Sequence, residues 1–292
     1  MSVSPPFVST VGAALERARR EWPSSETGPV EAQALLAYIL DRTRSWILAH
    51  PEAALPQAVS TKYFELVRRA AEGEPLAYLT GTREFFGLDF IVTPDALIPR
   101  PETELLVETA LEWISARGKR IAPADPPTRV VDLGTGCGCI AAALAVHVPD
   151  LQVIATDISV RALAIAMRNF AALGVSDRIR LIHADLLAAI AGPIDLLCAN
   201  LPYIPSATLD TLPVVRYEPR TALDGGPNGL RLIERALRQT VPLLAADGLA
   251  LFEIEASQGD AARTMSQIYF PKATIDVKKD AAGNDRLLYI RR

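Results

Sequence analysis

The sequence lacks several features that would assign it to other classes of protein. Its 292 residues contain no apolar run near the roughly 20 residues that a membrane helix needs. The first ten residues, MSVSPPFVST, lack the basic and apolar pattern of a secretory signal. The three cysteines are too few for a disulfide framework, and the net charge of -4 argues against a broad nucleic-acid-binding face. We therefore expect a cytoplasmic protein that binds neither membranes nor, directly, nucleic acid.

Apolar residues make up 50% of the chain, and their pattern changes along it. Residues 1–80 show short helical periodicities separated by proline and glycine, which predicts a small helical domain. Residues 81–104 contain TREFFGLDFIVT, a pattern typical of a β-hairpin, and are expected to form a linker. In residues 105–292 a helix and a proline-rich loop at 121–128 come first, and strands then alternate with helices. This alternation predicts an α/β domain with a mainly parallel sheet that is covered on both faces and has an antiparallel terminal strand.

A glycine-rich turn follows the first predicted strand of the α/β domain. It reads DLGTGCG, from Asp132 to Gly138. Glycines at 134, 136 and 138 let the backbone turn sharply and approach a ligand closely. The helix that follows presents free N–H groups at its start. The turn is not the dinucleotide fingerprint G-x-G-x-x-G. It indicates a ligand-binding loop only because a strand precedes it and a helix follows it.

Two acidic residues follow the next two strands. Asp157 comes about twenty residues after the glycines, where a carboxylate can accept both hydroxyls of a ribose. The alternative is that Asp157 or Ser159 only caps the next helix. Asp185 follows the third strand and could face an adenine amino group or simply form a turn.

The fourth strand ends in Asn200-Leu-Pro-Tyr203, which could be an ordinary turn because Asn and Pro are common there. A functional interpretation rests on the chemistry of amides. The nitrogen of a planar amide is a poor nucleophile because its lone pair is delocalised. The side-chain oxygen of Asn200 and the carbonyl of Leu201 could hold its N–H groups, while Pro202 stiffens the backbone and Tyr203 forms a flat wall. Such a site needs no metal.

These motifs carry a family resemblance. DLGTGCG, ATD at 155–157 and NLPY resemble class I S-adenosylmethionine-dependent methyltransferases that act on nitrogen. The segment GTREFFGLDFIVTPDALIPRPETELLVE closely resembles the linker of the release factor glutamine methyltransferase family, also called the HemK or PrmC family. YEPRTALDGGPNGL and LFEIEASQG resemble later blocks of that family. The resemblance runs from about residue 75 to the C-terminus, and the N-terminal helices fit by length and type.

The resemblance implies a Rossmann-like methyltransferase domain at 105–292 and a substrate-recognition domain at 1–80. It implies methyl transfer from S-adenosylmethionine to the glutamine of the Gly-Gly-Gln motif in bacterial class 1 peptide chain release factors. The residues that we assign to the cofactor are Asp132, Gly134, Thr135, Gly136, Cys137, Gly138, Asp157, Asp185, Leu186 and Asn200. Those that we assign to catalysis are Asn200, Leu201, Pro202 and Tyr203, and Arg100, Pro101 and Glu102 are expected nearby without assigned roles.

The sequence departs from the family pattern at two positions. The family usually has Asn-Pro-Pro-Tyr, and Leu201 stands at the second position here, which keeps the carbonyl acceptor but loses stiffness. The family commonly has Gly where this chain has Glu255. Two other functions stay open: an rRNA or DNA adenine methyltransferase, and a module that binds the nucleoside or the release factor without catalysis. Cys137 and Cys139 are expected to be packing residues, not metal ligands.

Overall fold

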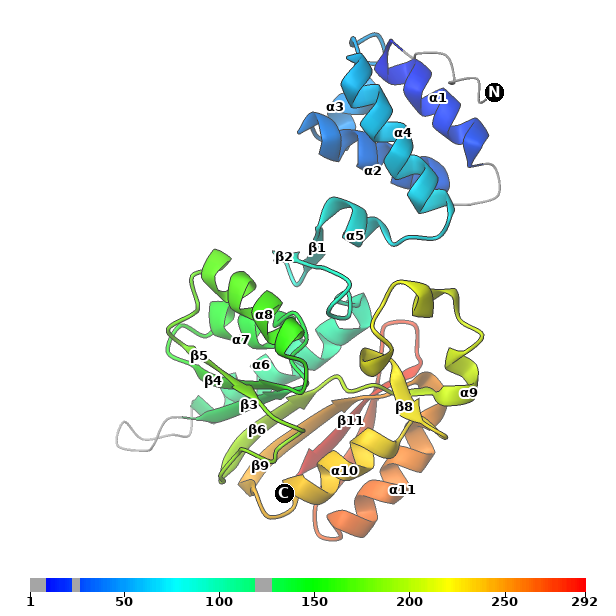
Figure 1. Cartoon of the computed structure of the whole chain (residues 1–292). Coiled ribbons are helices and arrows are strands. Elements are labelled where there is room, and N and C mark those ends of the chain that lie inside the picture. Colours follow the sequence, from blue (N-terminus) through cyan, green and yellow to red (C-terminus); the bar gives the residue numbers. More distant parts are fainter. Residues whose placement is uncertain (1–8, 23–26, 119–127) are drawn as a thin grey trace. The chain divides into compact units, whose positions relative to one another are not determined.

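The computed structural model describes residues 9–22, 27–118 and 128–292. They form two compact units, which we call unit 1 (Met1–Gly81) and unit 2 (Thr82–Arg292) (Figure 1). The proline-rich loop predicted at 121–128 lies outside the described residues except for Thr128. In the part of the chain that the structure describes, no helix is both long and apolar enough to cross a bilayer.

Unit 1 is helical and has a hydrophobic core of its own. Its helices are α1 (Val11–Glu21), α2 (Gly28–Leu40), α3 (Arg44–Ala49), α4 (Gln57–Ala71) and α5 (Leu76–Thr80). Thr10 caps α1 by accepting a hydrogen bond from the Ala13 N–H. Leu35, Ile47 and Tyr63 are fully buried between the helices.

Unit 2 begins with an antiparallel hairpin of β1 (Thr82–Phe85) and β2 (Leu88–Ile91), as the sequence predicts. The carboxamide of Asn169 on α8 accepts from the Ile91 N–H at 2.8 Å and donates to the Ile91 carbonyl at 3.0 Å, so the hairpin is fastened to the α/β body. The chain then passes through a 3₁₀ turn, η1 (Pro101–Thr103), into α6 (Glu104–Gly118).

A seven-stranded sheet organises the rest of unit 2. Its strands are β3 (Arg129–Leu133), β4 (Gln152–Asp157), β5 (Ile179–His183), β6 (Ile194–Ala199), β9 (Leu244–Glu253), β10 (Thr274–Lys279) and β11 (Asp285–Arg291). Their order is β10-β11-β9-β6-β3-β4-β5. All neighbours pair in parallel except at β11, which is antiparallel to both β9 and β10. The predicted parallel sheet with an antiparallel terminal strand is confirmed.

Helices cover both faces of the sheet (Figure 1). One face carries α6, α7 (Cys139–His147) and α8 (Val160–Ala172), and the other carries α10 (Arg231–Thr240) and α11 (Gly259–Tyr269). Alternate strand residues enter the two cores: Val130 and Leu196 pack with α6–α8, whereas Val131 and Leu197 pack with α10 and α11. The sheet is therefore apolar on both sides, and polar groups collect at the ends of its strands.

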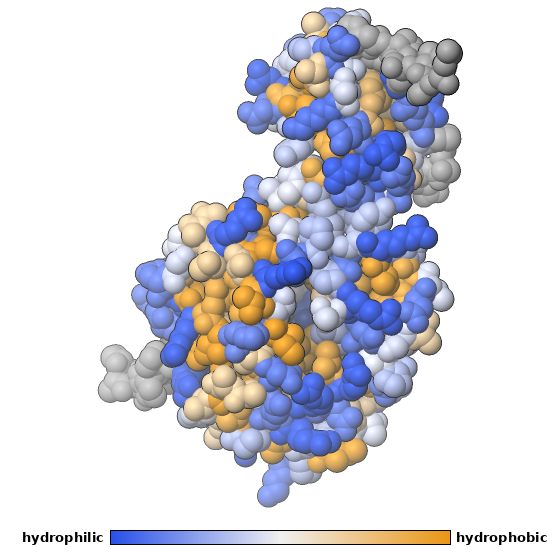
Figure 2. Space-filling view, in the orientation of Figure 1, coloured by the Kyte–Doolittle hydropathy of each residue, from blue (hydrophilic) through white to orange (hydrophobic). Residues whose placement is uncertain are grey.

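Short elements occupy the excursion between β6 and α10 and the turn after β9. They are β7 (Ile204–Pro205), α9 (Ser206–Leu209), η2 (Pro213–Arg216), η3 (Arg220–Ala222), β8 (Asp224–Gly226) and η4 (Ala256–Gln258). The excursion follows Asn200-Leu-Pro-Tyr203 directly, so it lies over the carboxyl end of the sheet. Figure 2 shows hydrophilic and hydrophobic side chains mixed over the visible face of unit 2, which is hollowed near its middle.

Candidate active site

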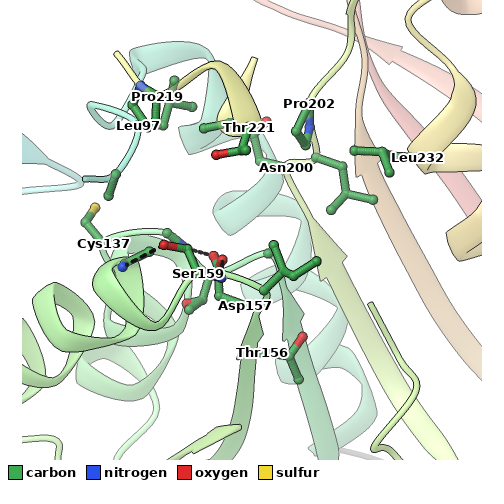
Figure 3. A pocket seen from close by; sticks show the side chains of 18 of the residues that line it. Leu97, Cys137, Thr156, Asp157, Ser159, Asn200, Pro202, Pro219, Thr221 and Leu232 are labelled. Carbon is green, nitrogen blue, oxygen red and sulfur yellow. Dashed lines mark hydrogen bonds between the residues drawn. The ribbon is translucent and has the colours of Figure 1, made fainter. Parts of the chain in front are cut away.

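Strand β3 marks the point where the strand order reverses, because β4 lies on one side of it and β6 on the other. At such a switch point the loops leaving adjacent strands diverge and leave a crevice at the carboxyl ends. A cavity of about 480 Å³ lies there. The turns after β3, β4 and β6 line it, together with residues 95–103 and 219–235 (Figure 3).

The glycine turn after β3 forms one wall of this cavity. Gly134, Thr135, Gly136 and Cys137 line it, whereas Gly138 lies behind the wall. A Cβ at Gly138 would lie 2.5 Å from the ring of Phe170, and φ there is +87°, so only glycine fits.

Asp132 supports the glycine turn from below and does not line the cavity. Its Oδ2 accepts from the Thr135 hydroxyl at 2.5 Å and from the Ala141 N–H at 3.2 Å. Oδ1 is buried without a partner among the described residues. Burial, which is complete, raises the pKa of Asp132 to about 7, and the charge of Asp157 adds to the increase.

Asp157 faces the cavity from the end of β4 and fastens the glycine turn. Its Oδ2 accepts from the Gly136 N–H and its Oδ1 from the Ser159 N–H, each at 2.8 Å. Ser159, not Asp157, is the cap of α8, because its hydroxyl accepts from the Ala162 N–H. Burial raises the pKa of Asp157, and the two N–H groups oppose that increase. The carboxylate is thus available to a ligand as well as to the turn.

Asp185 and Leu186 also line the cavity, at the end of β5. The Asp185 carboxylate pairs with Arg235 of α10 at 2.7 Å, and both side chains are about half exposed. Leu186 is buried and has a positive φ of +54°. The structure therefore adds an arginine partner that the sequence did not indicate.

The Asn200-Leu-Pro-Tyr203 turn forms the opposite wall, and Figure 3 shows Asn200 and Pro202 on the other side of the cavity from Asp157. The Asn200 Nδ2 group donates to the Thr103 hydroxyl at 2.9 Å. Leu201 is buried and packs over Gly134. Tyr203 does not line the cavity, and its hydroxyl donates to Glu253 at 3.0 Å instead.

Arg100 acquires a defined contact in the structure. It pairs with Glu218, a buried carboxylate whose Oε2 also accepts from the Ile98 N–H at 3.3 Å. The pair ties the segment before η1 to the excursion that covers the cavity. Pro101 and Glu102 are exposed, and Arg100 lines the cavity. The sequence reasoning did not single out Thr103, Glu218 or Glu253, although each stands in a block that resembles the family.

The strand order with its antiparallel β11, the glycine turn at the switch point and the acidic residue at the end of the next strand are features of the Rossmann-like fold that class I methyltransferases share. The fold agrees with solved structures. The catalytic domain of hMettl16 matches at 18% identity with a TM-score of 0.54 over 80% of this chain and 81% of its own. The N-terminal domain of human METTL16, solved in complex with SAH, matches at 18% identity with a TM-score of 0.50 over 70% and 76% of the two chains.

Sequence comparisons identify the family within that class. Residues 13–81 match the PrmC N-terminal domain, and residues 120–212 match the Methyltransferase small domain. A release factor glutamine methyltransferase of Moorella thermoacetica is 42% identical over 88% of this chain and 89% of its own. One of Nitratidesulfovibrio vulgaris is 36% identical over 97% and 96%. The chain belongs to the release factor glutamine methyltransferase (PrmC/HemK) family of S-adenosylmethionine-dependent enzymes.

Proposed function

We propose that this chain transfers the methyl group of S-adenosylmethionine to the side-chain amide nitrogen of a glutamine in a peptide chain release factor. The residues of the cavity fit the donor. Asp157 offers a carboxylate to ribose hydroxyls, the turn at 134–137 offers backbone at close range, and Leu186 offers an apolar wall. When bound, S-adenosylmethionine supplies an electrophilic methyl group on a sulfonium.

The orientation of the Asn200 amide is the observation that carries the proposal. Because its Nδ2 group already donates to Thr103, its Oδ1 is left to accept a hydrogen bond from the cavity. Asn200 and the Leu201 carbonyl can then hold the two N–H groups of a primary amide. Held in this way, the amide nitrogen directs its lone pair at the methyl group, and its proton leaves to water after transfer.

The identity of the acceptor is supported by the relatives, which carry the name release factor glutamine methyltransferase along 88–97% of this chain. The alternative of a nucleic-acid substrate is disfavoured by charge. The chain has 30 basic and 34 acidic residues, so it lacks the basic excess that is typical of a broad phosphate-binding face.

The test is a tritiated-methyl assay on the purified chain, offered release factor, rRNA and DNA in parallel. We expect label in the release factor alone, and mass spectrometry should place 14 Da on the glutamine of its Gly-Gly-Gln motif. A release factor in which that glutamine is replaced by asparagine is the matched control. Labelling of rRNA or DNA, or equal labelling of the control factor, would contradict the proposal.

A further inference from the structure

Asn169 is a buried amide on α8 whose side chain contacts two separate segments of unit 2. It is 0% exposed. Its Oδ1 accepts from the Ile91 N–H at 2.8 Å. Its Nδ2 donates to the Ile91 carbonyl at 3.0 Å and to the Cys137 carbonyl at 2.8 Å. A buried amide costs free energy unless it is hydrogen-bonded, so these three bonds account for its position in the core.

The neighbours of this amide fix its orientation. A primary amide has two N–H donors, and both are taken here by carbonyls, one from each segment. Rotation by half a turn would place the oxygen of the amide against the two carbonyls and its nitrogen against the Ile91 N–H. Asn169 is therefore a rigid link between the end of β2 and the glycine turn after β3.

The link holds a peptide unit of the glycine turn that a glycine would otherwise leave free to rotate. Gly138 has a φ of +87°, in a region that glycine enters readily. The Cys137 carbonyl accepts from Asn169, and the N–H of the same peptide bond, on Gly138, donates to the Thr135 carbonyl at 2.8 Å. Both polar groups of this peptide are thus bound within the protein. A turn that is ordered before its ligand arrives loses less entropy on binding.

The β1–β2 hairpin is at the other end of the link. Ile91 is the last residue of β2 and does not line the cavity. Because both of its backbone groups bind Asn169, the end of the hairpin cannot leave α8 without freeing the amide. A freed amide no longer holds the Cys137 carbonyl. Anchoring of the hairpin and order in the glycine turn therefore depend on one side chain.

We propose that Asn169 is a positioning residue that couples the β1–β2 hairpin to the glycine turn of the cofactor site. This inference rests on the proposed function for its ligand, S-adenosylmethionine, and adds a residue that does not itself line the cavity. Coupling between two sites is reciprocal. An anchored hairpin raises the affinity for cofactor, and bound cofactor holds the hairpin more firmly on α8.

The first experiment replaces Asn169→Asp, which keeps the size of the side chain and an acceptor for the Ile91 N–H but removes the donor. We expect the Kd for S-adenosylmethionine, measured by calorimetry, to rise about tenfold or more, because the Cys137 carbonyl loses its partner. The kcat at saturating cofactor should stay within about twofold of the parent, since the Asn200-Leu-Pro-Tyr203 turn is not touched.

Glu104→Ala is the matched control, because it frees the same hairpin at its other end. Glu104 accepts from the Phe86 N–H at 2.9 Å and does not line the cavity. The Kd of this variant should stay within about twofold of the parent. Equal rises in Kd in the two variants, or an unchanged Kd in a folded Asn169→Asp protein, would overturn the proposal.

Hydrogen exchange in the unmodified chain tests the coupling without any substitution. Saturating S-adenosylmethionine should slow exchange of the Ile91 N–H by about tenfold or more, although Ile91 lies outside the cavity. The Phe270 N–H, which donates to the Ser266 carbonyl at the end of α11, reports uniform stabilisation of unit 2. An Ile91 rate that the cofactor leaves unchanged, or equal slowing at Phe270, would show that no such coupling exists.

A ligand-free comparison separates this inference from the proposed function. Without cofactor, Asn169→Asp should speed exchange of both the Ile91 and the Gly138 N–H by about tenfold or more, whereas Glu104→Ala should leave Gly138 unchanged. Unaltered exchange at Gly138 in Asn169→Asp would refute the coupling even if release factor is methylated. Faster exchange at both amides, beside a parent chain that methylates no release factor, would refute the proposed function alone.

Discussion

At the residue scale, some side chains of unit 2 line the cavity and others hold the lining residues in place. Asn200 and Asp157 line the cavity, and both also make internal hydrogen bonds that determine how they face it. Asp132 makes only internal contacts, although the sequence placed it in the cofactor site. Substitutions of these residues should therefore affect cofactor binding and methyl transfer to different extents.

Asn200→Ala should remove methyl transfer and spare cofactor binding. The change deletes one acceptor for the target amide, and a hundredfold loss in single-turnover rate is about what removal of one preorganised hydrogen-bonding group causes. Asn200→Asp keeps an acceptor oxygen and should retain more activity, with equal or tighter affinity for the cationic cofactor. Single-turnover kinetics and calorimetry measure the two quantities. Full activity of Asn200→Ala would mean that the turn is only structural.

Asp132 should make unit 2 less stable as pH rises. Its pKa is about 7 in the folded chain and about 4 in an unfolded one, so the folded state binds the proton more tightly. The cost of ionising it is absent below pH 4, grows between pH 4 and 7, and is constant above pH 7. Asp132→Asn removes this cost. From pH 5 to pH 8, the advantage of the variant over the parent in unfolding free energy should therefore grow by about 2–3 kcal/mol, because ionisation of Asp132 costs about 1.4 kcal/mol for each of the two pH units between 5 and 7.

Urea unfolding of the ligand-free protein at the two pH values measures this difference. Trp113 reports on unit 2 if Trp22 and Trp46 of unit 1 are replaced by Phe in both proteins. If the parent and the variant differ in unfolding free energy by the same amount at pH 5 and at pH 8, Asp132 does not titrate in this range.

At the element scale, the segment from β8 to α10 holds the Asn200-Leu-Pro-Tyr203 turn from behind. Gly229 has a φ of +76°, and a Cβ there would lie 2.1 Å from the Tyr203 carbonyl oxygen and 2.3 Å from Gln258 Nε2. Gln258 in turn donates to the Tyr203 carbonyl at 2.9 Å. The glycine is thus needed both for its backbone conformation and for space.

Gly229→Ala should displace Tyr203 and with it the Asn200-Leu-Pro-Tyr203 turn. We expect kcat to fall about tenfold or more while cofactor affinity changes little, because the glycine turn after β3 is not touched. Gly283→Ala is the matched control. Its φ is +85°, so it suffers the same backbone strain, but nothing lies within 4 Å of its Cβ. If both variants lose the same stability and the same activity, strain alone would explain the result.

At the scale of the whole molecule, unit 1 and unit 2 have separate hydrophobic cores. All residues that line the cavity lie between 95 and 235, in unit 2. Unit 1 has its own core of apolar side chains from its five helices and matches the PrmC N-terminal domain. We propose that unit 1 docks the release factor, because the chemistry can proceed on residues of unit 2.

Deletion of residues 1–81 should therefore spare cofactor affinity and weaken methylation of intact release factor. A free Gly-Gly-Gln peptide makes fewer contacts with the enzyme, so its methylation should be affected less. The ratio of kcat/KM for the two acceptors, in the full chain and in the shortened one, measures the effect. Equal losses on both acceptors by a folded fragment would exclude a docking role for unit 1.

The sequence alone determined the fold class, most of the larger helices and strands, and the motifs at the strand ends. Apolar periodicity predicts these elements locally, and the turns DLGTGCG and NLPY are recognisable because consecutive residues form them. The short elements between β6 and α10 show no such pattern and are known only from the structure. That these two turns lie close together also follows from the sequence, since parallel strands end at the same edge of a sheet. The hairpin at 82–93 was predicted for the same reason, from local pattern around one glycine.

Only the tertiary structure decided which groups hold the site in place. Thr103 and Asn200 are 97 residues apart, Arg100 and Glu218 are 118 apart, and Tyr203 and Glu253 are 50 apart. No local pattern predicts such pairs, because a hydrogen bond depends on side-chain position to within a fraction of an ångström. That precision arises from the packing of η1, the turn after β6 and the end of β9 against one another. Glu253 in particular looks like any strand residue until its burial and its neighbours are known.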